Sequence, residues 1–434
     1  MTGQTDTSLW HPFSDMAAVR GDEFVVSRGE GIWLYDEDGN RYLDASASLW
    51  YCNVGHGRKE IAEAVARQMA ALEAYSIFGD IANRPALELA DVLSERAPMD
   101  DAKVFFTTGG GDAIDTAAKL ARLYWQVVGE PDRMHIVSRT SGYHGTMAFG
   151  TSIGGIDANR TGFGPLVPGT SVVEHDSAQA LRDEIERLGP ERVAAFFVEP
   201  VIGAGGVYPP APGYIEEVAA TCRETGVLLV LDCVITGFGR LGGWFGCERF
   251  GVKPDLATFA KGVTSGYLPL GGVLVSGHIA EPFWSERGHL VRHGQTYSGH
   301  ASVCAAGLAN IAILEREGLI PRGQELEGDL LDTLAALKDH PLVADVRGGV
   351  GLLAAVAFRP ELLEQDPALP SKAYKAIRAH GVLLRPLGRE VAVSPPLIIT
   401  VEEIAMIAGA IRAGLDDLAE TVEGAPMHVA SARP

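Results

Sequence analysis

Short apolar runs alternate with amphipathic segments through the middle of the chain. KVFFTT, VAAFFVEP, VLLVLD and GGVLVS have the pattern of buried strands, whereas GDAIDTAAKLARLYWQVV and GYIEEVAATCRETG repeat apolar residues at helical spacing. Buried strands that alternate with amphipathic helices form a mainly parallel sheet covered by helices on both faces. The pattern therefore predicts an α/β fold.

The two ends of the chain have different patterns. GIWLYDEDGNRYLDAS predicts a β-hairpin that turns at residues 38–40, and KEIAEAVARQMAALEA and PALELADVLSERA predict helices. Beyond residue 320, shorter strands (LVADVRG, LLAAVAF) and helices (SKAYKAIRAHG, EEIAMIAGAIRAGL) predict a smaller α+β domain. We expect an N-terminal arm with part of the small domain at 1–60, a large α/β domain at 61–320 and the C-terminal small domain at 321–434.

Composition narrows the class of protein. The 434 residues carry 56 acidic and 36 basic side chains, a formal charge of -20, which disfavours nucleic acid as a partner. The apolar runs are shorter than the ~20 residues of a membrane helix, and the N-terminus lacks a signal-peptide pattern. We therefore expect a cytoplasmic protein without a membrane partner. The five cysteines form no C-x-x-C pair, which argues against a disulfide framework or a metal site and for isolated, buried thiols.

A glycine run lies where one predicted strand meets a helix, at the edge where open α/β sheets bind ligands. Residues 107–112 have the sequence T-T-G-G-G-D and join KVFFTT to the helix. Glycines let the backbone approach a ligand, and a helix N-terminus offers N–H groups to an anion. A phosphate site and a plain tight turn both fit this run, which lacks the spacing of the nucleotide-binding motifs.

Two ionisable residues follow other predicted strands. Asp232 ends VLLVLD and is either a turn residue or an acid that pairs with a buried cation. Lys261 follows DLATFA and is either a surface lysine or an amine that loses its proton by desolvation and becomes a nucleophile. A phosphate cradle, an acid and a lysine on neighbouring strand ends are what pyridoxal 5′-phosphate (PLP) needs. The lysine forms a Schiff base with PLP, and the acid keeps the pyridine nitrogen protonated.

Ordered segments along the chain are similar to those of the class III (omega) aminotransferases of PLP fold type I. They are LWHPF, SLWYCNVGHGRKE, FFTTGGGDAIDTAAKLAR, GYHG, VEPVIGAGG, LVLDCVITGFGR, FAKGVTSGYLPLGG, HGQTYSGH and LLRPLG with VSPPL. The chain resembles this family from Trp10 to Leu418. The resemblance implies a large PLP-binding domain with a mainly parallel seven-stranded sheet covered by helices, and a smaller α+β domain from both chain ends.

The resemblance also implies roles for single residues. Lys261 corresponds to the lysine that carries PLP and moves the substrate proton, and Asp232 to the acid at the pyridine nitrogen. Tyr143 corresponds to the residue that stacks on the ring, and Thr296 to a threonine that reaches the phosphate of the partner subunit. The family's site lies at a dimer interface, so we expect a homodimer with shared sites, with which a tetramer is compatible. The expected cofactor-binding residues are Gly109, Gly110, Gly111, Tyr143, His144, Asp232, Ile235, Lys261 and Thr296.

Two segments depart from the family pattern. The phosphate loop of relatives has S-G-S-E-A where residues 109–113 of this chain have G-G-G-D-A, so a serine hydroxyl is missing at Gly111. Relatives have D-E-V where residues 232–234 have D-C-V. The first change predicts a phosphate site made of backbone N–H groups, and the second changes the polarity near the ring without removing the chemistry.

Other positions bear on the substrate. Arg385 corresponds to the arginine that grips the substrate carboxylate through two parallel hydrogen bonds, unless it is a surface residue at a strand edge. Trp50 and Tyr143 resemble pocket walls of the omega-amine:pyruvate branch, with Phe78 as a further candidate, although Trp50 fits a plain core position equally well. Residues 199–204 (E-P-V-I-G-A) lack the second glutamate of the ornithine and γ-aminobutyrate branches, and Ile235 replaces their glutamine.

These differences favour an aminotransferase that moves an amino group from an omega-amino acid or amine to an α-keto acid, with pyruvate expected, by ping-pong half-reactions through pyridoxamine phosphate. A diaminopelargonate-type aminotransferase is the second choice, because the chain shares its W-H-P and F-G-x-I segments. An aminomutase or decarboxylase of the same fold stays open, and so, with less support, does a PLP-fold protein without turnover.

Overall fold

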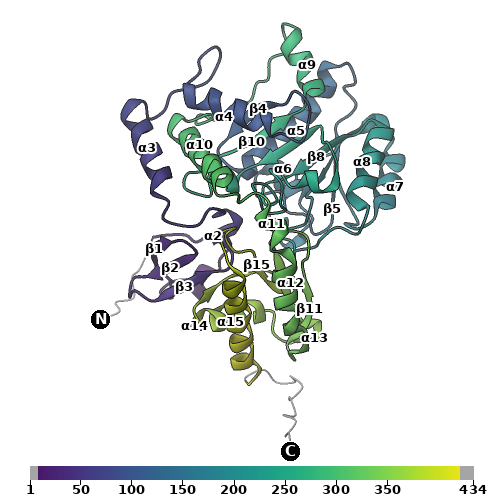
Figure 1. Ribbon diagram of the computed structural model, residues 1–434. Helices are drawn as coiled ribbons and strands as arrows, with labels where there is room; N and C mark the ends of the chain where they lie inside the picture. Colours follow the sequence, from purple (N-terminus) through teal and green to yellow (C-terminus); the bar gives the residue numbers. More distant parts are fainter. Residues whose placement is uncertain (1–7, 421–434) are drawn as a thin grey trace, which may run out of the picture.

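The computed structural model describes residues 8–420, and a seven-stranded sheet forms its centre (Figure 1). The strand order is β4-β10-β9-β8-β7-β5-β6, and only β10 runs antiparallel to its neighbours. The strands are β4 (Lys103–Thr107), β5 (His135–Arg139), β6 (Thr170–Val173), β7 (Val193–Val198), β8 (Leu228–Asp232), β9 (Leu256–Phe259) and β10 (Gly271–Val275). The expected mainly parallel seven-stranded sheet is confirmed.

Helices cover both faces of this sheet because its strands alternate between two apolar surfaces. Phe197 and Val230 pack with the alanine-rich helix α5, whereas Phe196 and Leu231 belong to the larger core that includes α4, α8 and α10. The helices α3, α4 and α10 pack side by side (Figure 1). The helices of this part are α3 (Lys59–Ala71), α4 (Arg84–Glu95), α5 (Gly110–Val127), α6 (Ala148–Ile153), α7 (Ala178–Leu188), α8 (Tyr214–Thr225), α9 (Gly277–Ser285) and α10 (Ala301–Arg316).

Two smaller sheets and further helices form the rest of the molecule. One sheet has the order β1-β2-β3-β13 and the other β11-β12-β15-β14. Their strands are β1 (Val26–Glu30), β2 (Trp33–Asp36), β3 (Arg41–Asp44), β11 (Val343–Arg347), β12 (Ala354–Phe358), β13 (Val382–Leu383), β14 (Arg385–Pro386) and β15 (Glu390–Val393). The helices are α1 (Met16–Val19), α2 (Ala47–Trp50), α11 (Arg322–Glu325), α12 (Glu327–Ala335), α13 (Pro360–Gln365), α14 (Leu369–Ala379) and α15 (Val401–Ala419).

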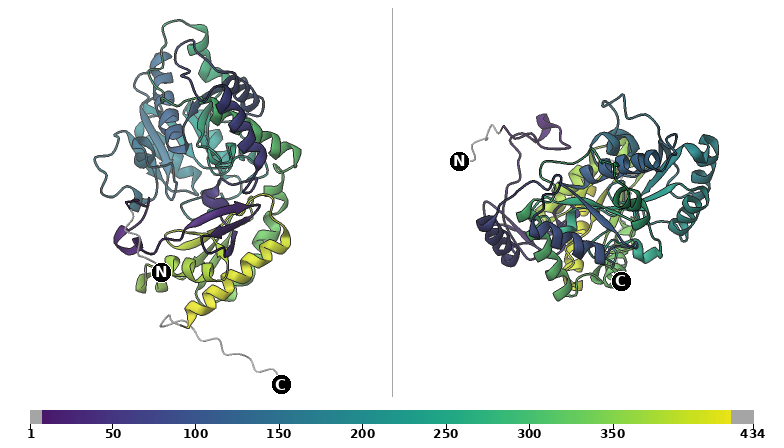
Figure 2. Two further views of the ribbon diagram at one scale, coloured as in Figure 1. Left: turned by 90° about the vertical axis from the view of Figure 1, so that its left-hand side faces the viewer. Right: turned by 90° about the horizontal axis from the view of Figure 1, so that it is seen from above.

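The smaller part combines both ends of the chain. β3 pairs in parallel with β13, so the N-terminal hairpin lies beside the C-terminal elements (Figure 2). The hairpin turns where the sequence predicts, because the Asp36 carboxylate accepts the N–H groups of Asp38 (3.0 Å) and Asn40 (2.8 Å). The expected smaller α+β domain from both ends is confirmed. Its division from the large domain at residues 60 and 320 stays a prediction, and residues 1–7 and 421–434 lie outside the described part.

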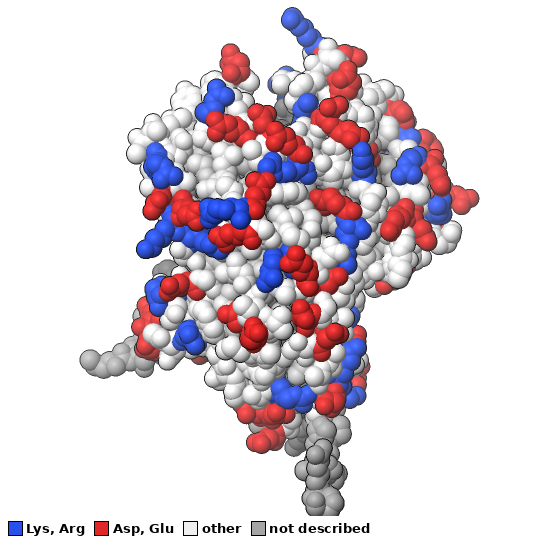
Figure 3. Space-filling model, in the orientation of Figure 1, with Lys and Arg blue, Asp and Glu red and all other residues white. Residues whose placement is uncertain are grey.

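The surface carries charges of both signs. Acidic and basic side chains are interspersed over the face shown in Figure 3, and several of them pair, as Arg316 does with Glu60 at 2.6 Å. Within residues 8–420, no helix is both long and apolar enough to cross a membrane. The five cysteines are buried and unpaired by disulfides, as expected. They are not all independent, however, because Cys247 adds to the effect of burial in raising the pKa of the Cys233 thiol.

Candidate active site

A cavity of about 470 Å³ lies at the carboxyl ends of β4, β8 and β9. These strands run in the same direction, so the residues that follow them meet at one edge of the sheet. The first turn of α5 and residues 143–147 form further walls. The expected site residues that line this cavity are Gly109, Gly110, Gly111, Tyr143, His144, Asp232, Ile235 and Lys261.

Asp232 is the last residue of β8 and is only 4% exposed. Its Oδ2 lies 2.8 Å from Nδ1 of His144, and its Oδ1 accepts the Thr258 hydroxyl (3.0 Å) and the Val234 N–H (3.2 Å). A carboxylate only accepts, so Nδ1 of His144 carries the proton in this contact. Three donors on three segments therefore fix the orientation of the carboxylate.

Lys261 follows β9 and begins a short 3-10 turn with a φ of +49°. This left-handed conformation is unfavourable for a side-chain-bearing residue, so neighbouring contacts must hold it. Asn310 on α10 does so by donating to the carbonyls of the next two residues, at 2.8 and 3.0 Å. Burial lowers the pKa of the Lys261 amine, against the opposing effect of Asp232 and Glu199. The amine is therefore closer to its neutral, nucleophilic form than a surface lysine.

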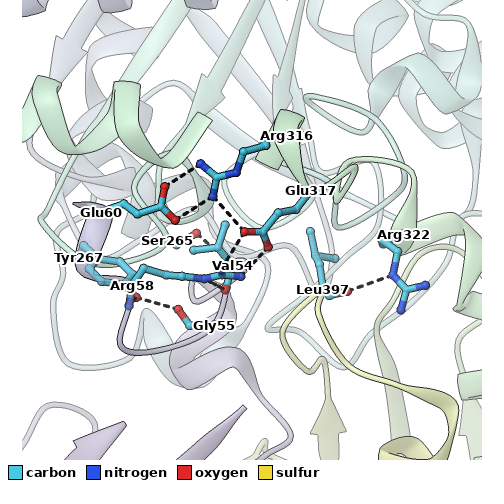
Figure 4. Close-up of polar contacts among 10 residues, drawn as sticks. All are labelled: Val54, Gly55, Arg58, Glu60, Ser265, Tyr267, Arg316, Glu317, Arg322 and Leu397. Atoms are coloured by element: carbon cyan, nitrogen blue, oxygen red, sulfur yellow. Dashed lines mark hydrogen bonds and ion pairs between the residues drawn. The ribbon is translucent and has the colours of Figure 1, made fainter. Parts of the chain in front are cut away.

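The loop after Lys261 is anchored to the N-terminal segment and to α10 (Figure 4). The Tyr267 hydroxyl donates to the carbonyl of Gly55 (2.9 Å) and accepts the N–H of Arg58 (2.7 Å). The Arg58 guanidinium in turn makes two 2.8 Å hydrogen bonds with Glu317, just beyond α10. The position of Lys261 thus depends on segments that are distant in the sequence.

The glycine run forms the beginning of α5, whose first N–H groups have no acceptor within the helix. A Cβ at Gly110 would lie 2.9 Å from Cγ1 of Val234, so a side chain does not fit there. A Cβ at Gly111 would lie 3.2 Å from Cγ of Met147, which can move because its side chain is 47% exposed. The hydroxyl of Thr108 donates to Asp112. This N-terminus of an 18-residue helix is suited to an anion such as phosphate.

Tyr143 lies half-buried at the cavity, and its N–H donates to Oε1 of Glu199 at 2.9 Å. Burial raises the pKa of the Tyr143 hydroxyl, and the positive charge of Arg385 opposes this. Burial likewise lowers the pKa of Arg385, against the effect of Tyr143 and Tyr374. The charge of Arg385 thus influences Tyr143, although Arg385 belongs to β14 and is not among the residues that line the cavity.

Three other expected residues lie apart from the cavity within this chain. Trp50 is 3% exposed and packs in an apolar cluster with Ile235 and Val201, and its indole N–H has no partner among the described residues. Phe78 is 55% exposed and lines a second cavity of about 590 Å³. Thr296 is exposed on the loop between α9 and α10. Trp50 thus lies behind Ile235, which lines the cavity.

Comparison with known proteins identifies the family. The family model described as aminotransferase class-III matches residues 16–415, which is most of the chain. The chain belongs to the class III aminotransferases. It is 36% identical to the putrescine–pyruvate aminotransferase of Pseudomonas aeruginosa, over 92% of this chain and 91% of that protein. It is 35% identical to the beta-alanine–pyruvate aminotransferase of the same organism, over 94% of this chain and 96% of that protein.

Solved structures agree with this assignment. An (S)-enantioselective omega-transaminase from Thermomicrobium roseum superposes with a TM-score of 0.89 at 40% sequence identity, over 94% of this chain and 96% of that one. Class III aminotransferases use PLP, and the residues of this cavity fit it. They supply N–H groups for the phosphate, a fixed carboxylate for the pyridine nitrogen and a half-buried amine, while Nε2 of His144 is buried without a partner among the described residues. This class III aminotransferase is a PLP-dependent enzyme.

Two residues of this aminotransferase that contact the site were not predicted from the sequence. Thr258 on β9 donates to Asp232, and Glu199 lines the cavity next to Lys261. The sequence pattern could have predicted Glu199, because this residue follows the apolar run VAAFFV in the same way that Asp232 ends VLLVLD. Thr258 could not be found in this way, since its contact depends on the register of β8 against β9, in which it lies opposite Asp232.

Proposed function

We propose that the enzyme transfers an amino group from an omega-amino acid or an amine to pyruvate. One observation carries the proposal: the charge of Arg385 affects the pKa of Tyr143 and Lys261 at the cavity, its Nε is buried without a partner, and no carboxylate pairs with it among residues 8–420. Ala204 stands where ornithine-type relatives have a glutamate, and it packs against the apolar cluster of Trp50. An arginine without a carboxylate partner is available to a keto acid.

The residues of the cavity would hold PLP in a defined way. Bound PLP supplies an aldehyde that condenses with amines and a ring that absorbs the negative charge left when a carbon–hydrogen bond breaks. The first turn of α5 would bind the phosphate, and the ring of Tyr143 would pack on the pyridine. Asp232 would keep the proton on the pyridine nitrogen, because His144, Thr258 and Val234 hold its carboxylate in place.

Lys261 would have two tasks in this site. Its amine would hold PLP covalently between turnovers. Once the substrate amine has taken its place, the free Lys261 amine would accept the proton from the substrate carbon. It would then return this proton one position away. Burial supports the second task, because a neutral amine accepts a proton and an ammonium does not. The amine lies in the cavity and is only partly exposed, which reduces the competition from bulk water for that proton.

The carboxylate of pyruvate would bind to Arg385, with two parallel hydrogen bonds to the guanidinium. An amine donor lacks that carboxylate, so the same space must then accept an apolar body. Tyr143 and Met147 offer apolar surface at the cavity, and Trp50 supports Ile235 from behind. Arg385 therefore has to turn away from the amine and return for the keto acid.

We also propose a cytoplasmic homodimer in which each site uses both subunits. Exposed aromatic and aliphatic side chains gather around the second cavity, where a folded monomer rarely exposes them. Phe78 and Leu290 line this cavity, and Tyr75 and Tyr297 are exposed on the same two segments, Tyr297 next to Thr296 in the sequence. Mixed dimers of the Lys261→Ala and Thr296→Val variants test this arrangement. Shared sites would give one intact site per mixed dimer and restored activity, whereas separate sites would give none.

A donor and acceptor panel tests the proposed reaction. Purified protein loaded with PLP receives putrescine or β-alanine as donor, with pyruvate or 2-oxoglutarate as acceptor. We expect alanine to form in step with loss of the donor, and no turnover without a keto acid. Release of CO₂ would indicate a decarboxylase, and an isomeric amine formed without acceptor would indicate an aminomutase. A preference for 2-oxoglutarate would contradict the choice of pyruvate, and activity restricted to a keto-acid precursor of diaminopelargonate would favour the second choice.

A further inference from the structure

Glu199 is a buried carboxylate at the site, and none of the proposed contacts with PLP involves it directly. It follows β7, is 3% exposed, and lines the cavity. No cationic side chain pairs with its carboxylate among residues 8–420, although the guanidinium of Arg139 donates to its main-chain carbonyl. Burial raises the pKa of the Glu199 carboxyl, which shows that its position is costly for a charged group.

The two oxygens of Glu199 join two segments that are distant in the sequence. Oε1 accepts the N–H of Tyr143 at 2.9 Å, and Oε2 accepts the N–H of Gly203 at 3.0 Å. A carboxylate accepts on both oxygens, whereas the amide of a glutamine accepts on one side and donates on the other. A glutamine here would therefore direct its own N–H₂ group at one of the two backbone N–H groups.

The glycine segment held by Glu199 is tight and has contacts on both sides. The N–H groups of Gly206 and Val207 both donate to the carbonyl of Gly203, at 3.1 and 3.0 Å. A Cβ at Gly205 would overlap the carbonyl of Ser141, so this segment lies directly against the residues that precede Tyr143. Movement of one segment therefore displaces the other.

The same segment is attached to the hairpin that carries Arg385. The guanidinium of Arg347 donates to the carbonyl of Gly206 (2.6 Å) and to Oε2 of Glu390 (3.0 Å). Glu390 begins β15, which pairs with the β14 strand of Arg385. Glu199 thus contacts Tyr143 directly, and the segment 203–206 connects it to the hairpin that carries Arg385.

We propose that Glu199 is a positioning residue that holds Tyr143 and the segment 203–206 as one unit, and that the enzyme's affinity for PLP depends on it through the ring of Tyr143. This inference rests on the proposed packing of Tyr143 against PLP. It does not depend on which amine or keto acid the enzyme uses, because the affinity for PLP is measured without substrates.

A double-mutant cycle on PLP affinity tests the inference. The protein is freed of PLP, and the dissociation constant is measured by titration with PLP in the visible spectrum. We expect Glu199→Gln to raise the constant about tenfold, the size expected when one hydrogen bond to a charged group is lost. In a Tyr143→Ala background the same change should raise it less than about twofold, because the ring through which Glu199 acts is absent.

Asp115 provides a matched control outside the cavity. Its Oδ1 also accepts two backbone N–H groups, those of Phe149 (3.0 Å) and Gly150 (3.1 Å), and burial raises its pKa as well. Asp115→Asn removes the charge but leaves an amide oxygen that can accept both N–H groups, so any effect on PLP affinity should be small and the same with and without the Tyr143 ring. An equal effect of Glu199→Gln in both backgrounds would overturn the proposal.

If Glu199→Gln does not fold, the variant Glu199→Asp still tests whether Glu199 holds the two segments together. Glu199→Asp retains the charge but is one methylene shorter and cannot reach both N–H groups. We expect hydrogen exchange to increase together in the peptides that contain Tyr143 and Gly203, with a smaller loss of PLP affinity. Faster exchange in only one of the two peptides would show that Glu199 does not hold them as a unit.

Discussion

Replacing Gly111 with serine restores a hydroxyl that the family pattern places in the phosphate loop. The position can take the side chain, because the new Cβ would meet only the flexible side chain of Met147, at 3.2 Å from its Cγ. One net hydrogen bond contributes ~0.5–1.5 kcal/mol. We therefore expect the dissociation constant of PLP to fall about two- to tenfold in Gly111→Ser.

Titration of the PLP-free protein, followed by absorbance of the bound cofactor, measures this change. Gly111→Ala is the first control, since it adds the Cβ without the hydroxyl and should not tighten binding. Gly110→Ser is the second, because its Cβ would lie 2.9 Å from the branched side chain of Val234 and should weaken binding by ~1–3 kcal/mol. Equal or weaker binding by Gly111→Ser would refute the reasoning and show that Gly111 serves the backbone geometry alone.

Three further predictions concern other parts of the site. Asp232→Asn should lower the steady-state rate by several orders of magnitude, since each unit of pKa lost at the pyridine nitrogen corresponds to ~1.4 kcal/mol; a rate within about threefold of wild type would place the pairing elsewhere. Arg385→Ala should raise the KM for pyruvate at least about tenfold and leave the half-reaction with a simple amine nearly unchanged in stopped-flow absorbance; equal loss in both halves would indicate a structural arginine. Arg58→Ala should reduce the free energy of unfolding by ~1–2 kcal/mol in urea, because it loses two 2.8 Å bonds to Glu317; an unchanged midpoint would remove this pair from the anchoring of the Lys261 loop.

Sequence pattern was sufficient for the residues that lie on regular elements. Asp232 ends and Lys261 follows an apolar run with the pattern of a buried strand, and β8 and β9 are indeed neighbours in the sheet. The glycine run likewise had to lie between β4 and α5, because an apolar strand precedes it and a helical pattern follows. These predictions succeeded because strand ends in a parallel sheet converge on one edge whatever the loops do.

Contacts set by register and irregular backbone could not be predicted in the same way. Thr258 contacts Asp232 because those two residues lie opposite each other on paired strands. Trp50 lies at a φ of +60°, and the preceding Ser48 and Leu49 have non-helical backbone angles within α2, so its side chain lies in the cluster behind Ile235. No periodic pattern encodes such a kink. Phe78 and Thr296 are exposed in the single chain, and the proposed role of Thr296 depends on a second subunit.

Borohydride reduction of the PLP-loaded protein, followed by peptide mass spectrometry, tests most directly that Lys261 holds the cofactor. Reduction makes the bond between PLP and its lysine permanent, so the modified residue can be located without any substrate. We predict a phosphopyridoxyl group on the peptide that contains Lys261, and none in Lys261→Ala. Modification of another lysine, such as Lys119 or Lys253, with Lys261 left free would contradict the proposed site.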